Sequence, residues 1–441
     1  MRNLAEALTA KYFAQSDREL VIGGIPVTKL AHEYGTPLFI YDRSVLDRKL
    51  DALHAALPSR FTIFYSIKAN PNAAIVKHFL RRGCGMEIAS YGELQQALHA
   101  GCAPEHILFA GPGKTEAELE LAISHGIGEI HLESLVETRR VGDISRRTGV
   151  RTRVAIRVNP ASEAEGGAMR MGGRPAPFGV DEEILEDVVD AVLSDRALDL
   201  QGIHFFTGTQ ILDAAVLTSQ YRHGLEVARR VVHRLGRQLR TIDFGGGLGI
   251  PYFAHENELD LAQVRSLLNE LWASVEADSA FAGTQFIVEP GRFLVGEAGV
   301  YVARVNDIKV SRGKKFLILD GGMNHHLAAS GNLGQTIKRN YPIAIINRLS
   351  ATTEETVDVV GPLCTPLDTL ARGAVLPKAE IGDLVGIFQS GAYGFTASPV
   401  GFLSHPAPAE ILVDSGASEL IRRGGNVGGV GCVVQQEISA R

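Results

Sequence analysis

The sequence predicts an α/β fold in which a (β/α)8 barrel is followed by a second, mainly antiparallel β-barrel or β-sandwich domain. Eight short apolar or β-branched runs alternate with stretches of helical periodicity across residues 62–291. After about residue 295 the helical pattern gives way to β-rich alternation. A chain of 441 residues with 45% hydrophobic content is long enough to bury the cores of two such domains.

The eight runs are predicted to be parallel barrel strands. They are TIFYSIK (62–68), GMEIAS (85–90), HILFAG (106–111), EIHLES (129–134), RVAIRV (153–158), GIHFFTG (202–208), TIDFGGG (241–247) and FIVEPG (286–291). The segments between them carry apolar residues every three or four positions and often end at glycine, as helices do. Eight such strand and helix units close a parallel barrel.

The domain boundaries follow from these patterns. We expect the barrel to occupy residues 30–294, and the β domain to combine residues 1–29 with residues 295–415. The segment VIGGIPVTKLAHEYGTPLFIYD can add a strand to the β domain before the chain enters the barrel, and residues 416–441 form a glycine-rich, flexible tail. Residues 159–180 predict a long loop, either a substrate lid or a tolerated insertion.

Composition excludes several classes of function. The formal net charge of -6 and the short basic runs disfavour nucleic-acid binding, which needs a clustered basic face. The four cysteines have neither the spacing of a zinc site nor that of a disulfide framework, and they fit a reducing cytoplasm. The N-terminus does not resemble a signal peptide, and no apolar run is long enough to span a membrane.

Several predicted strands end in polar or glycine residues, at the edge where barrels of this kind hold their active sites. These residues are Lys68, Glu87, Ser90, Glu133, Arg157, Gly245 to Gly247 and Glu289. Strands also end in polar turns without any function, so a single residue of this set is weak evidence.

Lys68 stands at the end of the first predicted strand, within YSIKANPN. Partial burial there would favour a neutral amine, which is the nucleophilic form that attacks carbonyl carbons. The alternative is an ordinary solvated lysine.

Two further motifs point to an anionic, ring-containing ligand. Gly245 to Gly247 follow an apolar run, so that backbone N–H groups can approach a phosphate closely; a plain tight turn is the alternative. In Glu289-Pro290-Gly291-Arg292, a carboxylate at a strand end could keep a pyridine nitrogen protonated, although a surface ion pair has the same pattern.

The order of these motifs resembles that of a known family. YSIKANPN, GTQ (208–210), DFGGGLG, VEPGR, GPLCTPLD and GAYG occur as in the barrel-type (fold type III) pyridoxal-phosphate decarboxylases, which include diaminopimelate, ornithine and arginine decarboxylases. The resemblance covers about residues 30–413. It implies a cytoplasmic carboxy-lyase of amino-acid metabolism, with pyridoxal 5'-phosphate as its cofactor.

The resemblance also implies roles for individual residues. Lys68 would carry the cofactor as a Schiff base, and Glu289 would pair with the pyridine nitrogen. Cys364 and Asp368 would be presented across the interface of a homodimer with shared active sites, with Cys364 as the proton donor after CO2 leaves and Asp368 in contact with the substrate. The cofactor phosphate would be held by Thr209, Gly246, Gly247, Arg292 and Tyr393.

Departures from the family pattern concern the cofactor ring and the substrate. Phe206 stands where relatives usually carry a histidine stacked on the ring, and His204 could partly substitute for it. Diaminopimelate decarboxylases have Cys-Glu-Ser-Gly-Asp where this chain has CTPLD, and their Arg-Pro-x-Leu-Tyr element is absent. Free diaminopimelate is therefore disfavoured as the substrate.

The variant pattern resembles the decarboxylases of specialised-metabolite, siderophore or exopolysaccharide clusters. Some members of that subgroup act on a glutamyl group carried by an acyl carrier protein. We expect substrate contacts from Arg339, Tyr341 and His326. His325 and His326 are not expected to bind a metal, since adjacent residues on a strand face opposite ways.

Three other functions remain open from the sequence. A racemase of the same architecture is disfavoured by Glu289 and Cys364, because racemases place an arginine at the ring nitrogen. A non-catalytic pyridoxal-phosphate carrier is disfavoured by the additional β domain. A Schiff-base barrel enzyme without this cofactor would need a sugar phosphate at the glycine cluster.

Overall fold

The computed structural model describes residues 4–16, 18–161, 169–170, 175–206, 208–335, 337–349 and 353–425. The chain forms two compact units. The β unit consists of Met1–Lys49, Pro251–Glu256 and Leu294–Arg441, and the barrel unit consists of Leu50–Ile250 and Asn257–Phe293. We describe each unit by itself.

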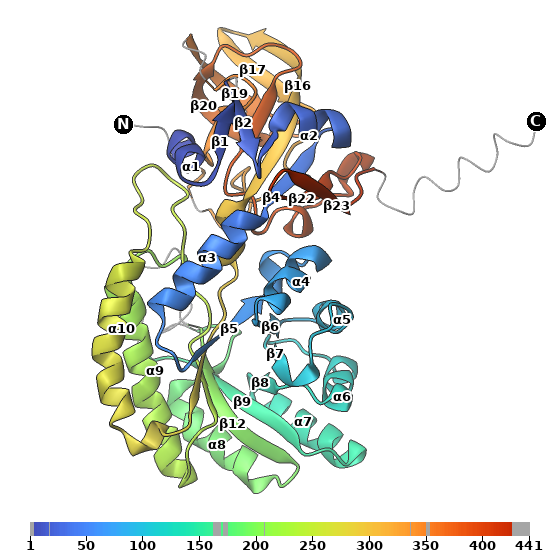
Figure 1. Ribbon diagram of the computed structural model, residues 1–441. Helices are drawn as coiled ribbons and strands as arrows, with labels where there is room; N and C mark the ends of the chain where they lie inside the picture. The colour runs from blue at the N-terminus through green and yellow to red at the C-terminus, as the bar shows by residue number, and fades with distance from the viewer. Residues whose placement is uncertain are drawn as a thin grey trace, which may run out of the picture. The chain divides into compact units, whose positions relative to one another are not determined.

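The barrel unit contains a closed parallel sheet of eight strands, and each strand overlaps one of the eight predicted runs. The strands are β5 (Phe61–Ser66), β6 (Gly85–Ile88), β7 (Ile107–Phe109), β8 (Glu129–Leu132), β9 (Thr152–Asn159), β12 (Leu198–Phe205), β14 (Thr241–Asp243) and β15 (Gln285–Val288). They pair in the order β9-β12-β14-β15-β5-β6-β7-β8, and the β8–β9 pair closes the ring (Figure 1). The predicted (β/α)8 barrel is confirmed.

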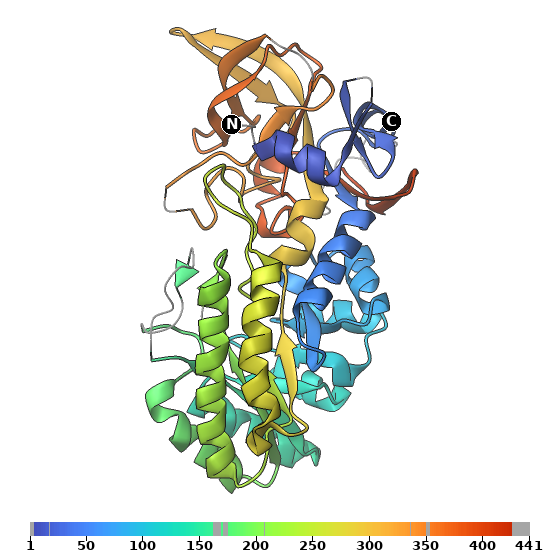
Figure 2. The same cartoon turned by 60° about the vertical axis from the view of Figure 1, so that its left-hand side comes forward.

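Helices follow the strands and cover the outside of the barrel. They are α4 (Ala73–Arg81), α5 (Tyr91–His99), α6 (Glu116–His125), α7 (Leu135–Thr148), α8 (Leu185–Ser194), α9 (Ala214–Leu235) and α10 (Leu261–Glu276). Side chains cap the N-termini of these helices except that of α8, and Thr115 and Glu118 form a reciprocal capping box at α6. α6, α7 and α9 end at glycines in the left-handed conformation, as the sequence pattern predicts. Figure 2 shows α9 and α10 side by side.

The β unit is built around one long strand, β16 (Gly299–Ser311). Its first half pairs with β4 (Leu38–Asp42) and β21 (Leu384–Ile387), and its second half pairs with β17 (Lys314–Leu319). The sheet continues through β18 (Ile343–Ile345), β19 (Glu354–Val360), β20 (Thr369–Pro377), β22 (Ala409–Asp414) and β23 (Ala417–Arg422). Most pairs are antiparallel, as predicted, but β17–β19 and β22–β4 are parallel.

The remaining described elements are short. The β unit also has α1 (Leu4–Tyr12), α2 (Val27–Tyr34) and a small sheet of β1 (Ala14–Ser16), β2 (Glu19–Ile22) and β3 (Ile25–Pro26), while α3 (Arg43–Ala56) connects to the barrel unit. Among the described residues, no helix has the length and apolar character needed to cross a membrane.

The limits of the units differ from the boundaries expected at residues 30 and 416. Residues 30–49 belong to the β unit because β4 is buried along its whole length between β16 and β22. Residues 417–422 form β23, which pairs with β22, where a flexible tail was expected. Of the loop predicted at 159–180, residues 162–168 and 171–174 lie outside the described residues, as does the glycine-rich end at 426–441.

Candidate active site

Lys68 lies where strand β5 opens into a short 3-10 helix (Ile67–Ala69). Its Nζ is 3.0 Å from both carboxylate oxygens of Glu87 at the end of β6, and the Lys68 side chain is 45% exposed. Glu87 is buried and also accepts a hydrogen bond from Ser66 Oγ. The amine therefore has one side open to a ligand and is oriented from the other side by a fixed carboxylate.

The glycine loop Gly245 to Gly247 follows β14 and leaves no room for side chains. Gly245 and Gly247 have φ angles of +67° and +93°, which other residues rarely adopt. A Cβ atom at Gly246 would lie 2.7 Å from the Glu289 carbonyl oxygen. The loop thus exposes backbone next to the end of β15, which is the shape that an anionic group requires.

Glu289 follows β15, and its backbone N–H donates to the carbonyl of Gly245. The side chain is buried, and its Oε1 accepts no hydrogen bond from any described residue. A buried carboxylate oxygen without a donor calls for a proton or cation, so this group fits a protonated pyridine nitrogen. Burial and the neighbouring Glu289 charge raise the pKa of Asp243, at the end of β14, far above its usual value.

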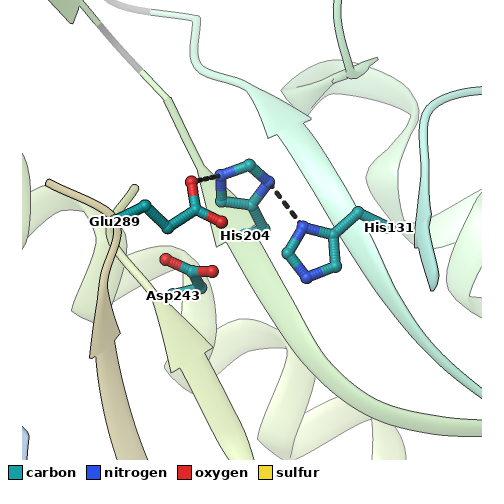
Figure 3. A group of neighbouring side chains, drawn as sticks. All are labelled: His131, His204, Asp243 and Glu289. Atoms are coloured by element: carbon teal, nitrogen blue, oxygen red, sulfur yellow. Dashed lines mark hydrogen bonds and ion pairs between the residues drawn. The ribbon is translucent and has the colours of Figure 1, made fainter. Parts of the chain in front are cut away.

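His204 does not lie where its proposed stacking role would place it. The imidazole is 1% exposed inside the barrel, with Nε2 3.3 Å from Glu289 Oε2 and Nδ1 3.0 Å from Nδ1 of His131 (Figure 3). Sequence reasoning missed His131 and Asp243 as members of this cluster. Both could have been recognised from the sequence as polar residues at inward-facing positions of predicted strands, in the runs EIHLES and TIDFGGG.

Phe206 is the aromatic residue beside the glycine loop. One of its ring carbons is 3.7 Å from the position that a Cβ on Gly246 would take. The guanidinium of Arg157 lies 5.8 Å from the centre of the same ring and forms an ion pair of 2.8 Å with Glu133. Burial alone would raise the pKa of Glu133, but the charges of Arg157 and Lys114 hold it below the usual value.

Two further phosphate ligands are predicted in the barrel unit, one before and one after the Gly245 to Gly247 loop in the chain. Thr209 lies in β13 (Gly208–Thr209), which pairs with β10 (Met169–Arg170). Arg292 is the first residue of α11 (Arg292–Val295), directly after the Glu289 segment. The preceding Gly291 allows the chain to pass close to Ala69, since a Cβ there would lie 2.8 Å from the Ala69 side chain. Lys68, Glu289 and Arg292 are thus brought to one edge of the barrel.

Three predicted site residues of the β unit have distinct environments. Cys364 is an exposed free thiol. Tyr393 has a left-handed backbone with φ +53°, a conformation that is often retained at functional positions. Asp368 is buried, and its two oxygens accept the backbone N–H groups of Met323 and Leu363 at 2.6 and 2.8 Å. In this chain Asp368 therefore fixes a loop, and the geometry does not support the substrate contact expected of it.

His326 is also a core residue rather than an exposed contact. It is fully buried, its Nε2 is 2.9 Å from Ser390 Oγ, and its ring packs against Tyr301 and Tyr341. Burial lowers its pKa to about 3, so it is neutral at physiological pH. The turn that follows β17 buries it, which the sequence, read as a strand, did not reveal.

Arg339 and Tyr341 line one pocket of the β unit, with a volume of about 360 Å³. The guanidinium of Arg339 lies over the ring of Phe253 and is 2.9 Å from the imidazole of His255. The ring of Tyr252 lies 4.7 Å from the ring of Tyr341 in a tilted arrangement and completes the aromatic wall. Of the expected substrate contacts, Arg339 and Tyr341 therefore line a cavity, while His326 is buried against Tyr341.

Comparison with known proteins agrees with this geometry. Residues 43–296 match the family model described as "Pyridoxal-dependent decarboxylase, pyridoxal binding domain". The chain belongs to this family. It is a decarboxylase of amino acids that uses pyridoxal phosphate, and the residues at the barrel edge fit that cofactor: an amine, a glycine cradle, an aromatic ring and a buried carboxylate.

Relatives of this decarboxylase cover nearly its whole length. It is 40% identical over 402 residues to an L-glutamyl-[BtrI acyl-carrier protein] decarboxylase from Niallia circulans, which spans 90% of this chain and 94% of the relative. It is 33% identical to a diaminopimelate decarboxylase from Archaeoglobus fulgidus over 93% and 95% of the two chains. The crystal structure of a diaminopimelate decarboxylase from M. jannaschii with L-lysine superposes with a TM-score of 0.86 at 25% identity, over 94% and 95% of the chains. These likenesses favour decarboxylation over the racemase, carrier and cofactor-free alternatives.

Proposed function

We propose that this decarboxylase acts on an L-glutamyl group that is attached to an acyl carrier protein. The observation that carries the proposal is its 40% identity, over 90% of its length, to an enzyme named for that substrate. Thr365 supports it, since diaminopimelate decarboxylases have a glutamate there that binds the distal charged end. The Thr365 hydroxyl accepts a hydrogen bond from Leu367 N–H and carries no charge for a free ammonium group.

The chemistry of the reaction dictates how the glutamyl group would be attached. Decarboxylation at the α-carbon would need a free α-amine, through which the substrate could bind the cofactor, and a free α-carboxylate as the group that is lost. The side-chain carboxyl group is then the remaining point of attachment. Such a substrate presents a neutral distal end, in agreement with Thr365.

We assign roles to the barrel residues on this basis. When bound, pyridoxal phosphate supplies an electron-accepting ring conjugated to the α-carbon. Lys68 would hold the cofactor, and Glu87 orients the Lys68 amine. Glu289 would keep the ring nitrogen protonated, the backbone at Gly246 and Gly247 and the side chains of Thr209 and Arg292 would hold the phosphate, and Phe206 would contact the ring.

The roles of Cys364 and Tyr393 rest on the family resemblance. Cys364 would return a proton to the α-carbon after CO2 departs, and its exposed thiol suits a group that acts on a ligand. Tyr393 would contribute its hydroxyl to the phosphate, and the left-handed backbone at that position supports a specific functional geometry.

The pocket around Arg339 and Tyr341 is proposed to bind the part of the substrate that does not react. Its aromatic wall suits an alkyl and amide chain, and the fixed guanidinium suits a phosphate. The phosphopantetheine arm of a carrier protein has both chemistries. The β unit thus offers a recognition surface for a tethered substrate.

Carrier-loaded glutamate should be turned over at least about a hundredfold more efficiently than any free amino acid, because binding energy from the arm is used to position the reacting group. The experiment compares L-glutamyl phosphopantetheine thioester on a carrier protein, the same thioester on pantetheine alone, and free glutamate, diaminopimelate, ornithine and lysine. CO2 release and the mass of the carrier are followed. Fastest turnover of a free amino acid would overturn the tethered substrate.

A variant pair tests the pocket. Arg339→Ala should raise KM for the carrier-loaded substrate about tenfold with little change in kcat, as expected for lost binding energy. Arg312→Ala, on an exposed turn of the same unit, is the matched control. Equal KM values for the two variants would remove Arg339 from the proposal.

We also propose a cytoplasmic homodimer with shared sites, in which Cys364 of one subunit serves Lys68 of the other. Mixing the inactive variants Lys68→Ala and Cys364→Ala should then restore activity. If the subunits reassociate at random, about half of the dimers are mixed and each has one intact site, so that up to about one quarter of the wild-type activity returns. Sedimentation at several concentrations gives the oligomeric state. A monomer with full activity, or a mixture that never regains activity, would contradict the shared site.

A further inference from the structure

The pocket of about 360 Å³ in the β unit is bordered by three exposed cations. Arg339 lines the pocket, and Lys338 precedes it in the chain. Arg372 lies beside the pocket because its backbone N–H donates to Asn340 Oδ1 at 2.9 Å and its carbonyl accepts from Asn340 Nδ2 at 2.7 Å. Asn340 itself and Gly373, the residue after Arg372, line the pocket. We call Lys338, Arg339 and Arg372 the basic rim.

The charges of the basic rim are not neutralised by neighbouring side chains. In the part of the chain that the structure describes, no carboxylate forms an ion pair with the basic rim; Lys338 donates to the amide oxygen of Asn332, and Arg339 donates to the imidazole of His255. Other cations of the same unit do have carboxylate partners: Arg43 with Asp414, Lys315 with Glu355, Arg348 with Asp383, and Arg422 with Glu410. The basic rim therefore keeps its positive charge for a ligand from outside the chain.

The segments that form the rim contain no acidic residues. Residues 321–353 and 369–379 have neither aspartate nor glutamate, although the chain as a whole has a formal net charge of -6. The described side chains that line the pocket include no carboxylate either. A local excess of positive charge on an otherwise acidic protein attracts and orients a negatively charged partner.

Large apolar side chains lie exposed next to these cations. Ile337, directly before Lys338, is 71% exposed, and Val375 of β20, which lines the pocket, is 53% exposed. Protein interfaces combine apolar and aromatic side chains and arginine with a charged border, whereas a small anion alone needs no apolar border. The surface therefore suits a protein that presents acidic and apolar side chains together.

We propose that the basic rim, with Ile337 and Val375, is the docking site of the acyl carrier protein, and that it binds an acidic face next to the phosphopantetheine attachment point. This inference deepens the proposed function and rests on the carrier-linked substrate. Since Arg339 belongs to both the rim and the pocket, a carrier docked on the rim would place its arm at the pocket. Lys338 and Arg372 would contact carboxylates of the carrier, and Arg339 would contact the phosphate.

Salt dependence is the first test. Attraction between exposed charges acts mainly on the rate of association and is screened by salt. Raising the salt concentration from about 50 mM to about 300 mM should lower kcat/KM for glutamyl-loaded carrier at least about fivefold. The L-glutamyl thioester of pantetheine, which has neither a protein nor a phosphate, should be affected much less.

Charge reversal tests the residues. The double variant Lys338→Glu/Arg372→Glu should raise KM for the glutamyl-loaded carrier at least about tenfold with little change in kcat, and it should change KM for the pantetheine thioester less than about twofold. The matched control is Lys309→Glu/Arg312→Glu, which alters the net charge equally at two exposed positions of the same unit and should behave like the wild type. Normal turnover of the pantetheine thioester shows that the variant is folded.

A carrier protein with reversed charges gives the complementary result. The probe is an acyl carrier protein with acidic residues next to its phosphopantetheine serine, and these residues are replaced by lysine. The altered carrier should bind poorly to the wild-type enzyme and regain affinity for Lys338→Glu/Arg372→Glu, because opposite charges face each other again. Failure of the two sets of changes to compensate would count against direct contact and overturn the proposal.

Binding is measured separately from turnover, so that the two proposals can fail independently. Fluorescence anisotropy of the phosphopantetheine-bearing carrier without its glutamyl group gives Kd for the holoenzyme. Binding that is lost on charge reversal, without decarboxylation of the loaded carrier, would support the docking site and overturn the glutamyl substrate. Turnover of the loaded carrier that is unaffected by Lys338→Glu/Arg372→Glu, or absence of carrier binding, would overturn the docking site. A changed oligomeric state of this variant in sedimentation would also overturn it, since a second copy of the chain would then cover the rim.

Discussion

Replacing Lys68 with alanine is expected to abolish covalent attachment of the cofactor and to lower turnover by at least about a thousandfold. The Lys68 amine is the nucleophile that would bind the cofactor aldehyde, and the alanine variant has no amine at this position after β5. The buried Glu87, 3.0 Å from Nζ, would lose its cationic partner, so some loss of stability should accompany the loss of activity.

Two measurements check this result. The visible absorbance of the lysine-bound cofactor should vanish, and borohydride reduction followed by peptide mass spectrometry should label the peptide that contains Lys68 in the wild type only. Lys77→Ala, an exposed lysine of α4, is the control and should keep both signals. A cofactor label on another lysine of the wild-type protein would end the assignment.

Replacing Glu289 with glutamine is expected to lower kcat by about a hundredfold to ten-thousandfold while the cofactor stays bound. Glutamine keeps the size of the side chain but cannot hold a positive charge on the ring nitrogen, so the ring accepts electrons poorly. The phosphate is anchored elsewhere, at the loop of Gly246 and Gly247, and the cofactor Kd should change by less than about tenfold.

The ratio of the two losses is the decisive quantity. Cofactor Kd is measured by fluorescence titration of the apoenzyme, and kcat by CO2 release from saturating substrate. Glu270→Gln, on the exposed face of α10, should leave both constants unchanged. Equal losses of cofactor affinity and turnover in Glu289→Gln would mean that Glu289 anchors the cofactor and does not tune it.

Local sequence patterns were sufficient for the parts of the site that depend on strand ends. Lys68, Gly245 to Gly247 and Glu289 each follow an apolar run, and parallel strands in one barrel bring their carboxyl ends to the same edge. The role of the glycine run could also be predicted from the sequence. A left-handed backbone and a close approach of the chain both favour glycine over other residues.

Long-range packing decided the residues that the sequence misplaced. Asp368 and His326 looked like ligand contacts because they are polar residues in motif-bearing segments, yet one caps backbone N–H groups and the other is buried beneath Tyr341. Burial is set by neighbours that are distant in sequence, such as Met323 for Asp368 and Ser390 for His326.

The amino-acid sequence by itself determined the barrel and the family and placed Lys68 at a strand end, since periodicity, strand-end residues and motif order are local properties. Only the tertiary structure decided that residues 30–49 belong to the β unit and that His131, His204 and Glu289 meet inside the barrel. The physical reason is that a line of side chains across a barrel joins strands that are not neighbours, so its members share no spacing along the chain and meet only when the sheet closes.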